Sequence, residues 1–228
     1  MRGEQPGQLR RQMVDAVLAD EFVAGWRAAV APWQPSLLAV PRHEFLPDTV
    51  WVTNHEDGGS PAYVPLDREQ GPDRWLRLAY AADDGVVTQV DDGCPAGPGG
   101  RGSLPSSSAS GPVIVAVMLA ALDVREGHRV LEVGTGAGYN AALLAHRLGA
   151  GQVISIEIDP EIATHARKAL SEAGFGAVTV ATGEGALGYP PGAPYDRVIV
   201  TAACNRVSYA WVQQTRPGGR IVVPWADT

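Results

Sequence analysis

The chain has 228 residues, of which 45% are hydrophobic and 19% charged, enough to bury the core of one sizeable α/β domain with an N-terminal addition. The formal net charge of −7 argues against a nucleic-acid partner, because no basic run stands apart to meet a phosphate backbone. The two cysteines, Cys94 and Cys204, lie far apart and in no metal-like spacing, so the sequence predicts neither a disulfide framework nor a metal site.

No segment is typical of a membrane span or a secretory signal. The longest apolar run covers residues 113–122, about half of the ~20 residues that a spanning helix needs. Acidic residues interrupt the segment that follows the charged N-terminus, so the apolar centre of a signal peptide is missing there. We therefore expect a soluble, cytoplasmic protein without a membrane partner.

The first hundred residues predict a helix followed by short extended segments. The helix is expected over residues 9–30, a proline-spaced stretch follows at 40–51, and the run at 74–80 alternates before a short apolar run at 85–90. Because aromatic side chains are core residues more often than ligand cages, we expect residues 1–105 to form a lid or recognition layer packed on a sheet domain. Four of the six tryptophans fall in this part: Trp26, Trp33, Trp51 and Trp75.

A stretch rich in glycine, proline and serine covers residues 91–111. A loop of about twenty residues is too long for a passive connector in a compact domain, so this one is expected to be disordered or functional. Its serines stand directly before an apolar helix that begins near Pro112, a residue suited to a first helical turn. On composition alone, a flexible linker is the alternative.

From residue 128 onward, short apolar runs alternate with helical patterns. Continuous apolar strands that alternate with helices are typical of a parallel sheet covered on both faces. The sequence therefore predicts an α/β, doubly wound domain over residues 106–228. The expected strands cover residues 129–133, 152–158, 177–181, 197–203 and 219–225, and the expected helices cover 139–148, 161–174 and 209–215.

A glycine-rich turn, VLEVGTGAGYN, joins the first of these strands to its helix. Glycines are needed where the backbone turns tightly and a ligand presses against it. Glu157 ends the second strand 19 residues after Gly138, near the spacing at which a carboxylate holds ribose hydroxyls. Tyr139 stands where a dinucleotide fold would have a third glycine, and Glu132 suits a ligand with an ammonium and a sulfonium. This favours S-adenosylmethionine over NAD.

The segment EVGTGAGYNAALLA resembles motif I of class I methyltransferases, specifically the protein-L-isoaspartate O-methyltransferase family. VPRHEFLP at 40–47, GEGALGYPPGAPYDRVIVTAA at 183–203 and RPGGRIVVPW at 216–225 are similar to further elements of that family. The resemblance implies a Rossmann-like methyltransferase fold with an N-terminal helical and β addition. It also implies S-adenosylmethionine as cofactor, S-adenosylhomocysteine as product, and a peptide or protein substrate that carries aspartate or isoaspartate.

The resemblance also assigns candidate site residues. Ser110 falls at the family's Ser-Ala/Gln-Pro element and is the candidate catalytic residue, expected to hydrogen-bond the substrate carboxylate; the alternative is a helix cap in a solvated linker. The candidate substrate-binding residues are Thr88, Gln89, Ser108 and Ser110. The candidate cofactor-binding residues are Glu132, Gly134, Thr135, Gly136, Gly138, Glu157 for the ribose, Ile158, Gly183, Glu184 for the adenine, and Gly185.

Three features depart from the family pattern. The segment before Ser110 is enlarged, Gly111 occupies the middle of the Ser-Ala/Gln-Pro element, and Glu184 replaces an aspartate. The pattern also ends after a fifth strand, where the family fold normally continues with an antiparallel hairpin, so the sequence is a truncated piece or the fold closes differently. In these features the sequence resembles the methyltransferases that act in ribosomal peptide biosynthesis in actinobacteria.

The sequence therefore predicts O-methylation of an aspartate in a ribosomally made precursor peptide, leading to succinimide or isoaspartate. The alternatives are repair of isoaspartyl residues in damaged proteins, methylation of a small carboxylic acid, and an inactive module that binds the cofactor or a partner. Cys204 lacks the proline that precedes the nucleophile of C5-pyrimidine methyltransferases. The NPPY element of amino-methylating nucleic-acid enzymes is absent from the sequence, which disfavours base methylation.

Overall fold

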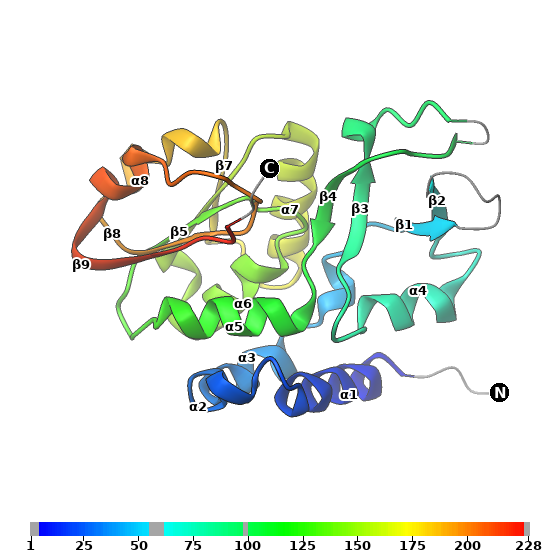
Figure 1. The fold of residues 1–228 in the computed structure, drawn as a ribbon, viewed down its shortest axis with the longest axis horizontal. Coiled ribbons are helices and arrows are strands. Elements are labelled where there is room, and N and C mark those ends of the chain that lie inside the picture. The colour runs from blue at the N-terminus through cyan, green and yellow to red at the C-terminus, as the bar shows by residue number, and fades with distance from the viewer. Residues whose placement is uncertain (1–4, 55–61, 98–99, 226–228) are drawn as a thin grey trace.

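A sheet of five parallel strands forms one half of the protein in a computed structural model, which describes residues 5–54, 62–97 and 100–225 (Figure 1). Every residue of the three central strands is buried, as expected for apolar strands covered on both faces. The predicted α/β fold with a mostly parallel sheet is confirmed. In sheet order the strands are β7 (Thr179–Thr182), β6 (Val153–Glu157), β5 (Val130–Val133), β8 (Tyr195–Val200) and β9 (Thr215–Val222).

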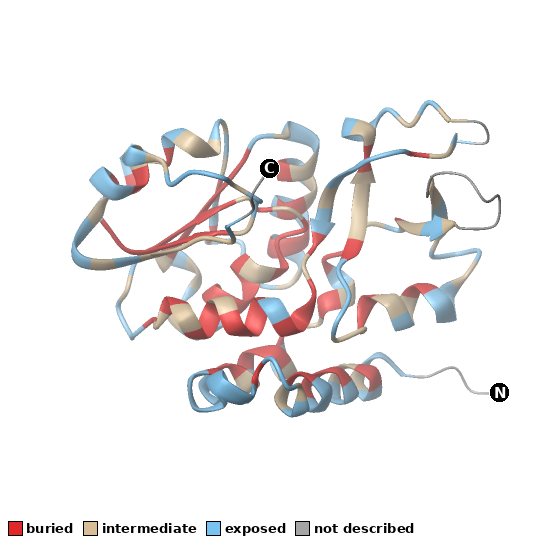
Figure 2. Cartoon of the chain, viewed as in Figure 1, coloured by how far each residue is buried: buried red, intermediate tan, exposed pale blue. Residues whose placement is uncertain are grey.

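Helices cover both faces of this sheet. Ile199 of β8 belongs to a buried cluster with α5 (Pro112–Leu122), α6 (Tyr139–Leu148) and α7 (Pro160–Glu172). Its neighbours Val198 and Val200 belong to a second cluster that includes Trp211 of α8 (Tyr209–Gln214). Since successive residues of a strand point to opposite faces, the two clusters are the two sides of the sheet. Figure 2 shows buried residues along α5, α6 and the strands of this sheet.

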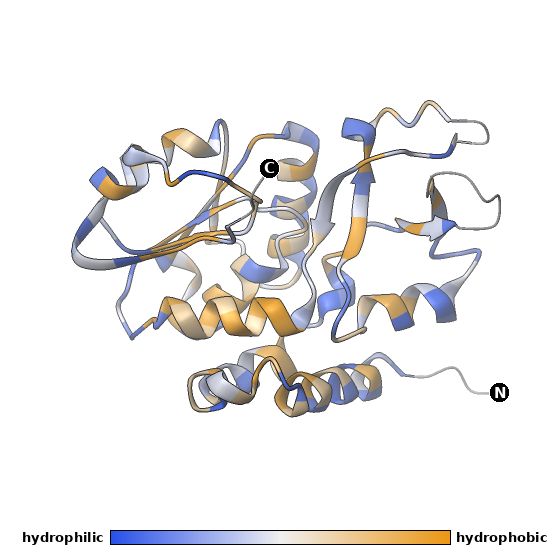
Figure 3. Cartoon of the chain, in the orientation of Figure 1, coloured by the Kyte–Doolittle hydropathy of each residue, from blue (hydrophilic) through white to orange (hydrophobic). Residues whose placement is uncertain are grey.

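An N-terminal helical layer lies against the far side of α5. It consists of α1 (Pro6–Ala19), α2 (Arg27–Val30) and α3 (Gln34–Ala39), which pack on α5 and α6 (Figure 1). Helix α5 is therefore enclosed between this layer and the sheet, which explains why it is apolar on nearly all sides (Figure 3). Among the residues that the structure describes, no helix combines the length and the apolar character required to cross a membrane.

A second, antiparallel sheet lies beside the parallel one. It contains β1 (Thr49–Asn54), β2 (Ala62–Asp67), β3 (Val86–Val90) and β4 (Pro105–Ala109) in the order β2-β1-β3-β4. Helix α4 (Pro72–Ala79) joins β2 to β3. Because β4 is an edge strand directly before α5, it brings the serine-rich stretch next to the parallel sheet (Figure 1). The remaining short 3₁₀ turns are η1 (Ala24–Trp26), η2 (Ala31–Trp33), η3 (Arg42–Glu44), η4 (Asp91–Gly93), η6 (Ala150–Gln152), η7 (Gly185–Leu187) and η8 (Pro190–Gly192).

Three N-terminal predictions differ from the structure. The helix expected over 9–30 ends at Ala19, because Asp20 takes an extended conformation and its side chain accepts a hydrogen bond from the Phe22 amide (2.8 Å). The alternating run at 74–80 is helix α4, in which Trp75 and Ala79 are buried one helical turn apart. The stretch expected to be a loop at 91–111 contains strand β4, which pairs with β3 although it is PSSSA in sequence.

The division predicted between residues 105 and 106 falls within β4, whose strand partner lies in the preceding segment. The assignment of separate roles to residues 1–105 and 106–228 stays a prediction. Residues from both parts form the larger buried cluster, including Met13 and Leu37 from the helical layer and Leu119 and Leu143 from α5 and α6.

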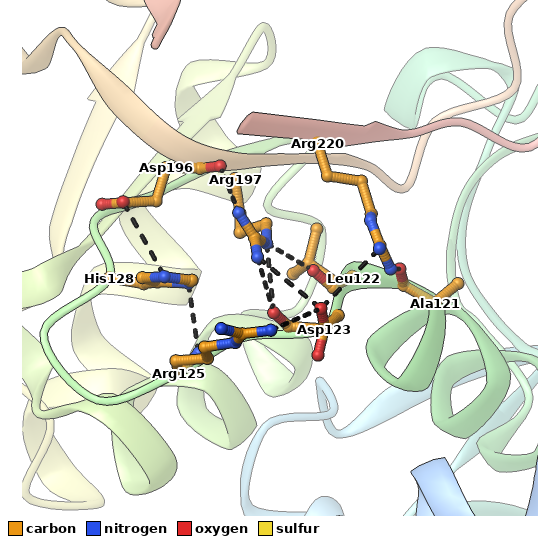
Figure 4. A network of polar contacts seen from close by, with 8 residues as sticks. All are labelled: Ala121, Leu122, Asp123, Arg125, His128, Asp196, Arg197 and Arg220. Atoms are coloured by element: carbon orange, nitrogen blue, oxygen red, sulfur yellow. Dashed lines mark hydrogen bonds and ion pairs between the residues drawn. The ribbon is translucent and has the colours of Figure 1, made fainter. Parts of the chain in front are cut away.

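A polar network closes the amino-terminal edge of the parallel sheet (Figure 4). Asp123 ends α5 in the left-handed conformation (φ 49°), and Arg197 of β8 donates to the carbonyl oxygens of Leu122 (2.7 Å) and Asp123 (2.9 Å). The carboxylate of Asp123 also lies within 4 Å of the guanidinium groups of Arg125, Arg197 and Arg220. These contacts satisfy the carbonyl groups at the helix end and tie α5 to β8 and β9.

Candidate functional site

A cavity of about 410 Å³ opens at the carboxyl edge of the parallel sheet. It lies beside β5, which has β6 on one side and β8 on the other, so the strand order reverses there. Open α/β sheets bind their ligands at such a reversal. Edge strand β4 forms the facing wall, so the cavity lies between the two sheets. The lining residues include Gln89, Asp92, residues 105–110, Val115, Met118, Glu132, residues 134–137, Tyr139, Asn140, residues 157–159, Ile162, Ile199 and residues 201–203.

The glycine turn of residues 134–138 lines this cavity, and at Gly134 and Gly136 no side chain covers the backbone. Gly134, Gly136 and Gly138 have φ values of 93°, 51° and 89°, in the left-handed region that favours glycine. A Cβ at Gly134 would lie 2.9 Å from Thr201 Oγ1, and one at Gly136 would lie 3.6 Å from the carbonyl oxygen of Ser108. The turn is therefore held between the end of β8 and the serines of β4. Gly138 does not line the cavity but packs under it against α7.

Glu132 is a fully buried carboxylate at the end of β5. It accepts hydrogen bonds from Asn140 Nδ2 (2.7 Å) and Ser155 Oγ (2.5 Å), and Ser155 Oγ also lies 2.6 Å from Thr135 Oγ1. Burial raises the pKa of Glu132 to about 7, and the two hydrogen bonds offset part of that shift. A cationic group placed in the cavity would lower the pKa again, so Glu132 suits an ammonium ligand.

Glu157 ends β6 with its carboxylate turned toward the glycine turn. Its oxygens accept from the backbone amides of Gly136 (2.8 Å), Ile158 (3.0 Å) and Asp159 (3.2 Å). The residue is 8% exposed, and the next residue, Ile158, is 64% exposed and lines the same cavity. This pair suits a nucleoside, because a carboxylate can accept hydrogen bonds from the ribose hydroxyls and an exposed apolar side chain can pack against the base.

Ser108 and Ser110 line the cavity from β4 and the residue after it. The alternative role for Ser110, a helix cap, is not what the structure has, because Gly111 occupies the N-cap position of α5 and no side chain caps it. Gly111 is required there, since a Cβ would lie 2.9 Å from the carbonyl oxygen of Asp83. This close approach explains the glycine in the middle of the Ser-Ala/Gln-Pro element.

Gln89 connects the antiparallel sheet to the start of α7 at the edge of the cavity. Its Oε1 accepts from Ser106 Oγ (2.7 Å), and its Nε2 donates to Asp159 Oδ2 (2.9 Å) at the start of α7. This hydrogen bond is the largest cause that lowers the pKa of Asp159. Asp159 also caps α7 by accepting from the amides of Glu161 and Ile162.

A second cavity of about 350 Å³ adjoins the first, and the two share Gln89, Gly136, Ala137 and Ile162. Thr88 lies in the second cavity and donates to Ser107 Oγ (3.2 Å), so the predicted substrate residues are divided between the two spaces. The walls of the second cavity are largely apolar and come from β1, β3, α7 and the turns next to them. They include Pro47, Trp51, Val90, Pro95, Ile162 and His165.

Gly183, Glu184 and Gly185 lie outside the residues that line the main cavity. The Glu184 side chain is exposed and accepts from the amide of Ala186 (3.1 Å), while the Gly183 amide donates to the Glu157 carbonyl oxygen (2.8 Å). A Cβ at Gly185 would lie 2.7 Å from Val133 Cγ1, which explains that glycine by packing. The adenine contact predicted for Glu184 stays a prediction.

Several residues at the site were not singled out from the sequence. Asn140 and Ser155 hold Glu132, Asp159 holds Gln89, and Thr201 donates to the carbonyl oxygen of Gly134. Ser155 had a readable signal, because it is a polar residue inside an otherwise apolar strand. The Gln89–Asp159 contact joins residues 70 positions apart, and no local pattern indicates such a contact.

Comparison with known proteins places this geometry in a family. Residues 102–227 match the family model described as "Protein-L-isoaspartate(D-aspartate) O-methyltransferase (PCMT)". A protein-L-isoaspartate O-methyltransferase of Methanopyrus kandleri is 36% identical over 96% of this chain and 77% of its own length. The matched segment spans about half the length of several other curated relatives with the same name.

Solved structures agree with the sequence matches. A protein-L-isoaspartate O-methyltransferase aligns with 95% of this chain and 55% of its own at a TM-score of 0.65 and 25% identity. A protein from Plasmodium falciparum, described as a putative member of the same family in complex with S-adenosyl-L-homocysteine, aligns with 98% of this chain and 85% of its own. Its TM-score is 0.61 at 12% identity, so that second match speaks for the fold alone.

Proposed function

Because the chain belongs to the protein-L-isoaspartate O-methyltransferase family, we propose that it is an S-adenosylmethionine-dependent carboxyl O-methyltransferase that acts on aspartyl or isoaspartyl residues of a polypeptide. The observation that carries the proposal is the cavity between the bare glycine turn and the serines of β4. The wall that contains the glycine turn suits the cofactor, and the wall formed by β4 suits the group to be methylated, so one cavity can hold both reactants.

The residues of the cofactor wall fit S-adenosylmethionine. Glu132 would bind its ammonium group, Glu157 its ribose hydroxyls and Ile158 one face of its adenine, while the glycine turn admits the ligand close to the backbone. When bound, the cofactor supplies an electrophilic methyl group on a sulfonium.

The serines of β4 suit the acceptor. A carboxylic acid with a pKa of ~4 is already ionised at neutral pH, so no strong general base is required. Ser110 and Ser108 would hold one carboxylate oxygen and leave the other aligned with the methyl group. Holding two reactants in line is worth up to ~7–11 kcal/mol of the barrier.

The relatives favour an isoaspartyl residue as the acceptor, as in repair of damaged proteins. An ordinary aspartate of a dedicated precursor peptide is the second candidate. It is motivated by the segment that departs from the family pattern, because Asp92 from this segment lines the first cavity and Gly93 and Pro95 line the second. Residues flanking the acceptor would then run past Gln89 and Thr88 into the second cavity. In either product the nitrogen of the neighbouring backbone amide can attack the methyl ester, which releases methanol and forms a succinimide.

Mass spectrometry of reactions with S-adenosylmethionine tests these candidates. The substrates are matched peptides that differ only in a normal or iso linkage at one aspartate. Methylation of the iso form alone supports repair, whereas methylation or water loss at the normal aspartate supports peptide modification. Binding of S-adenosylhomocysteine without turnover of any peptide, including a precursor encoded beside the gene, would overturn the enzymatic proposal and favour a binding module.

Substitution of Ser110 tests the residue assignment. We expect Ser110→Ala to lower kcat/KM for the peptide at least about tenfold, because a hydrogen bond to a charged group is lost. Ser103→Ala is the matched control, since Ser103 is exposed and lies outside both cavities. Equal rates for the wild type and Ser110→Ala would refute the role of Ser110.

A further inference from the structure

The described residues that line the main cavity include four carboxylic acids and no lysine, arginine or histidine. The acids are Asp92, Glu132, Glu157 and Asp159. Such a wall attracts a cationic cofactor, but it repels the carboxylate that is to be methylated. A positive charge behind the acceptor wall would offset this repulsion, and the structure contains one.

Arg42 lies directly behind Ser110. It begins η3 and is completely buried, and its guanidinium donates to four backbone carbonyl groups. Nη2 donates to Ala109 (3.0 Å) and Ser110 (2.9 Å), and Nη1 donates to Ala79 (3.1 Å) and, at 3.5 Å, to Ala81. One side chain therefore fixes the end of β4 and the residue proposed to hold the acceptor, against the end of α4.

The charge of Arg42 is not neutralised by a nearby acid. Among the described residues, no carboxylate lies within ion-pair distance of its guanidinium, which lies 5.8 Å from the centre of the Tyr139 ring in the cavity wall. Burial lowers its pKa to about 10, so the group remains protonated at neutral pH. Arg42 Nε and Tyr139 Oη are both buried and have no hydrogen-bond partner among the described residues. Even with its four carbonyl partners, a buried cation that lacks a carboxylate is costly, and its field extends further than that of an exposed cation.

We propose that Arg42 is a positioning residue for the acceptor carboxylate: it fixes the backbone of Ala109 and Ser110, and it supplies positive potential behind Ser110. The inference rests on the proposed methyl transfer to a carboxylate. It assigns the two requirements of the site to different walls, with Glu132 and Glu157 on the cofactor wall and the buried arginine behind the acceptor, where it also opposes the charge of Asp92 beside Ser106.

Two variants separate the effect of the charge from that of the fixed geometry. Arg42→Lys keeps the charge but loses the planar fork of donors, whereas Arg42→Met loses both. We expect Arg42→Met to weaken peptide binding more than about tenfold and Arg42→Lys to weaken it several-fold. S-adenosylhomocysteine affinity should change less than about twofold in both, because the cofactor wall is untouched.

Arg197→Met is the matched control. Arg197 is also buried and also donates to backbone carbonyl groups, but at the opposite edge of the sheet and within 4 Å of a carboxylate. Arg197→Met should lower thermal stability and leave the affinity for the peptide unchanged. If Arg42→Met and Arg42→Lys lower stability in the same way without changing peptide affinity, the proposal is wrong and Arg42 is purely structural.

Calorimetric titration of the S-adenosylhomocysteine-loaded protein with an aspartyl or isoaspartyl peptide measures this affinity without turnover. A wild-type protein that binds the peptide but never methylates it would contradict the proposed function. The role of Arg42 could still be tested in that case, because its variants are compared by their affinity for the peptide. A double-mutant cycle of Arg42→Lys with Ser110→Ala serves if Arg42→Met does not fold. A non-additive effect on peptide affinity is expected if Arg42 acts through Ser110, and full additivity would overturn that role.

Discussion

Glu132 illustrates how burial sets the chemistry of a single residue. The carboxylate has no exposed surface, and its hydrogen bonds to Asn140 and Ser155 only partly replace water, so its pKa rises from 4.5 to about 7. In the unfolded chain the group ionises near pH 4.5. Ionisation of Glu132 therefore disfavours the ligand-free fold, and its contribution to stability declines as the pH rises from about 4.5 to 7.

Cofactor binding should show the opposite trend with pH. Below pH 7 an ammonium ligand has to displace a proton from Glu132, so we expect affinity for S-adenosylhomocysteine to fall roughly tenfold per pH unit there and to level off above it. Calorimetry between pH 5.5 and 8.5 measures the profile. Glu132→Gln should bind more weakly at pH 8 and lose the slope. Parallel profiles for the two proteins would show that Glu132 does not contact the ammonium group.

Replacement of Gly134 should weaken cofactor binding in addition to any loss of stability. Alanine there would adopt a positive φ and place its Cβ 2.9 Å from Thr201 Oγ1, so we expect Gly134→Ala to weaken S-adenosylhomocysteine binding at least about tenfold. Gly127 has a similar φ of 80° with open space around it. Gly127→Ala should therefore cost about 1–2 kcal/mol of stability and preserve binding. Equal binding losses in both variants would contradict this account.

At the scale of elements, the segments predicted best are those whose pattern is local. The helix expected over 139–148 is α6 as predicted, because apolar spacing and flanking glycines define it. Strand β4 could not be predicted, since PSSSA has no apolar alternation and is extended only through its pairing with β3. The run at 74–80, most of which lies in helix α4, was predicted as an alternating run because its seven residues satisfy both periods. The Arg42 contacts with β4 join distant elements, and no local spacing encodes them.

The link from β4 through Gln89 to α7 should matter for substrate more than for stability. Gln89→Ala removes the hydrogen bonds to Ser106 and Asp159, so we expect KM for the peptide to rise several-fold while stability changes by less than about 1 kcal/mol. The pKa of Asp159 should rise toward its ordinary value, which carboxyl NMR can follow. Gln213→Ala, on exposed α8 surface, is the control. An unchanged pKa of Asp159 would show that the bond is absent in solution.

The whole molecule is held by a core to which both parts of the chain contribute. Arg147 of α6 stacks 4.8 Å from the Trp33 ring, and His146 Nδ1 lies 2.9 Å from Ser36 Oγ. Helix α5 would expose its outer apolar face if the helical layer were removed. We therefore expect the described elements before residue 106 to fold together with the parallel sheet as one unit.

Expression of residues 106–228 alone tests this statement. We expect the fragment to lack a cooperative urea transition and to bind 8-anilinonaphthalene-1-sulfonate, because β4 loses its partner and α5 its cover. The full chain under the same conditions is the control. A sharp unfolding transition in the fragment, together with S-adenosylhomocysteine binding, would show that the second part folds independently.

If the proposed function is correct, we expect the acidic lining of the main cavity to affect the order in which the reactants bind and leave. A polypeptide carboxylate that enters first would meet four acids opposed by the charge of Arg42, whereas one that enters after the cofactor would also be attracted by the sulfonium. Transfer of the methyl group from sulfur to the carboxylate would leave a neutral thioether and a neutral ester, so the ester would lose this attraction while Glu132 would still hold the ammonium group of the product. We expect compulsory order, with S-adenosylhomocysteine competitive against S-adenosylmethionine and noncompetitive against the peptide. Initial-rate product inhibition distinguishes this from random addition, in which either reactant can bind the empty cavity.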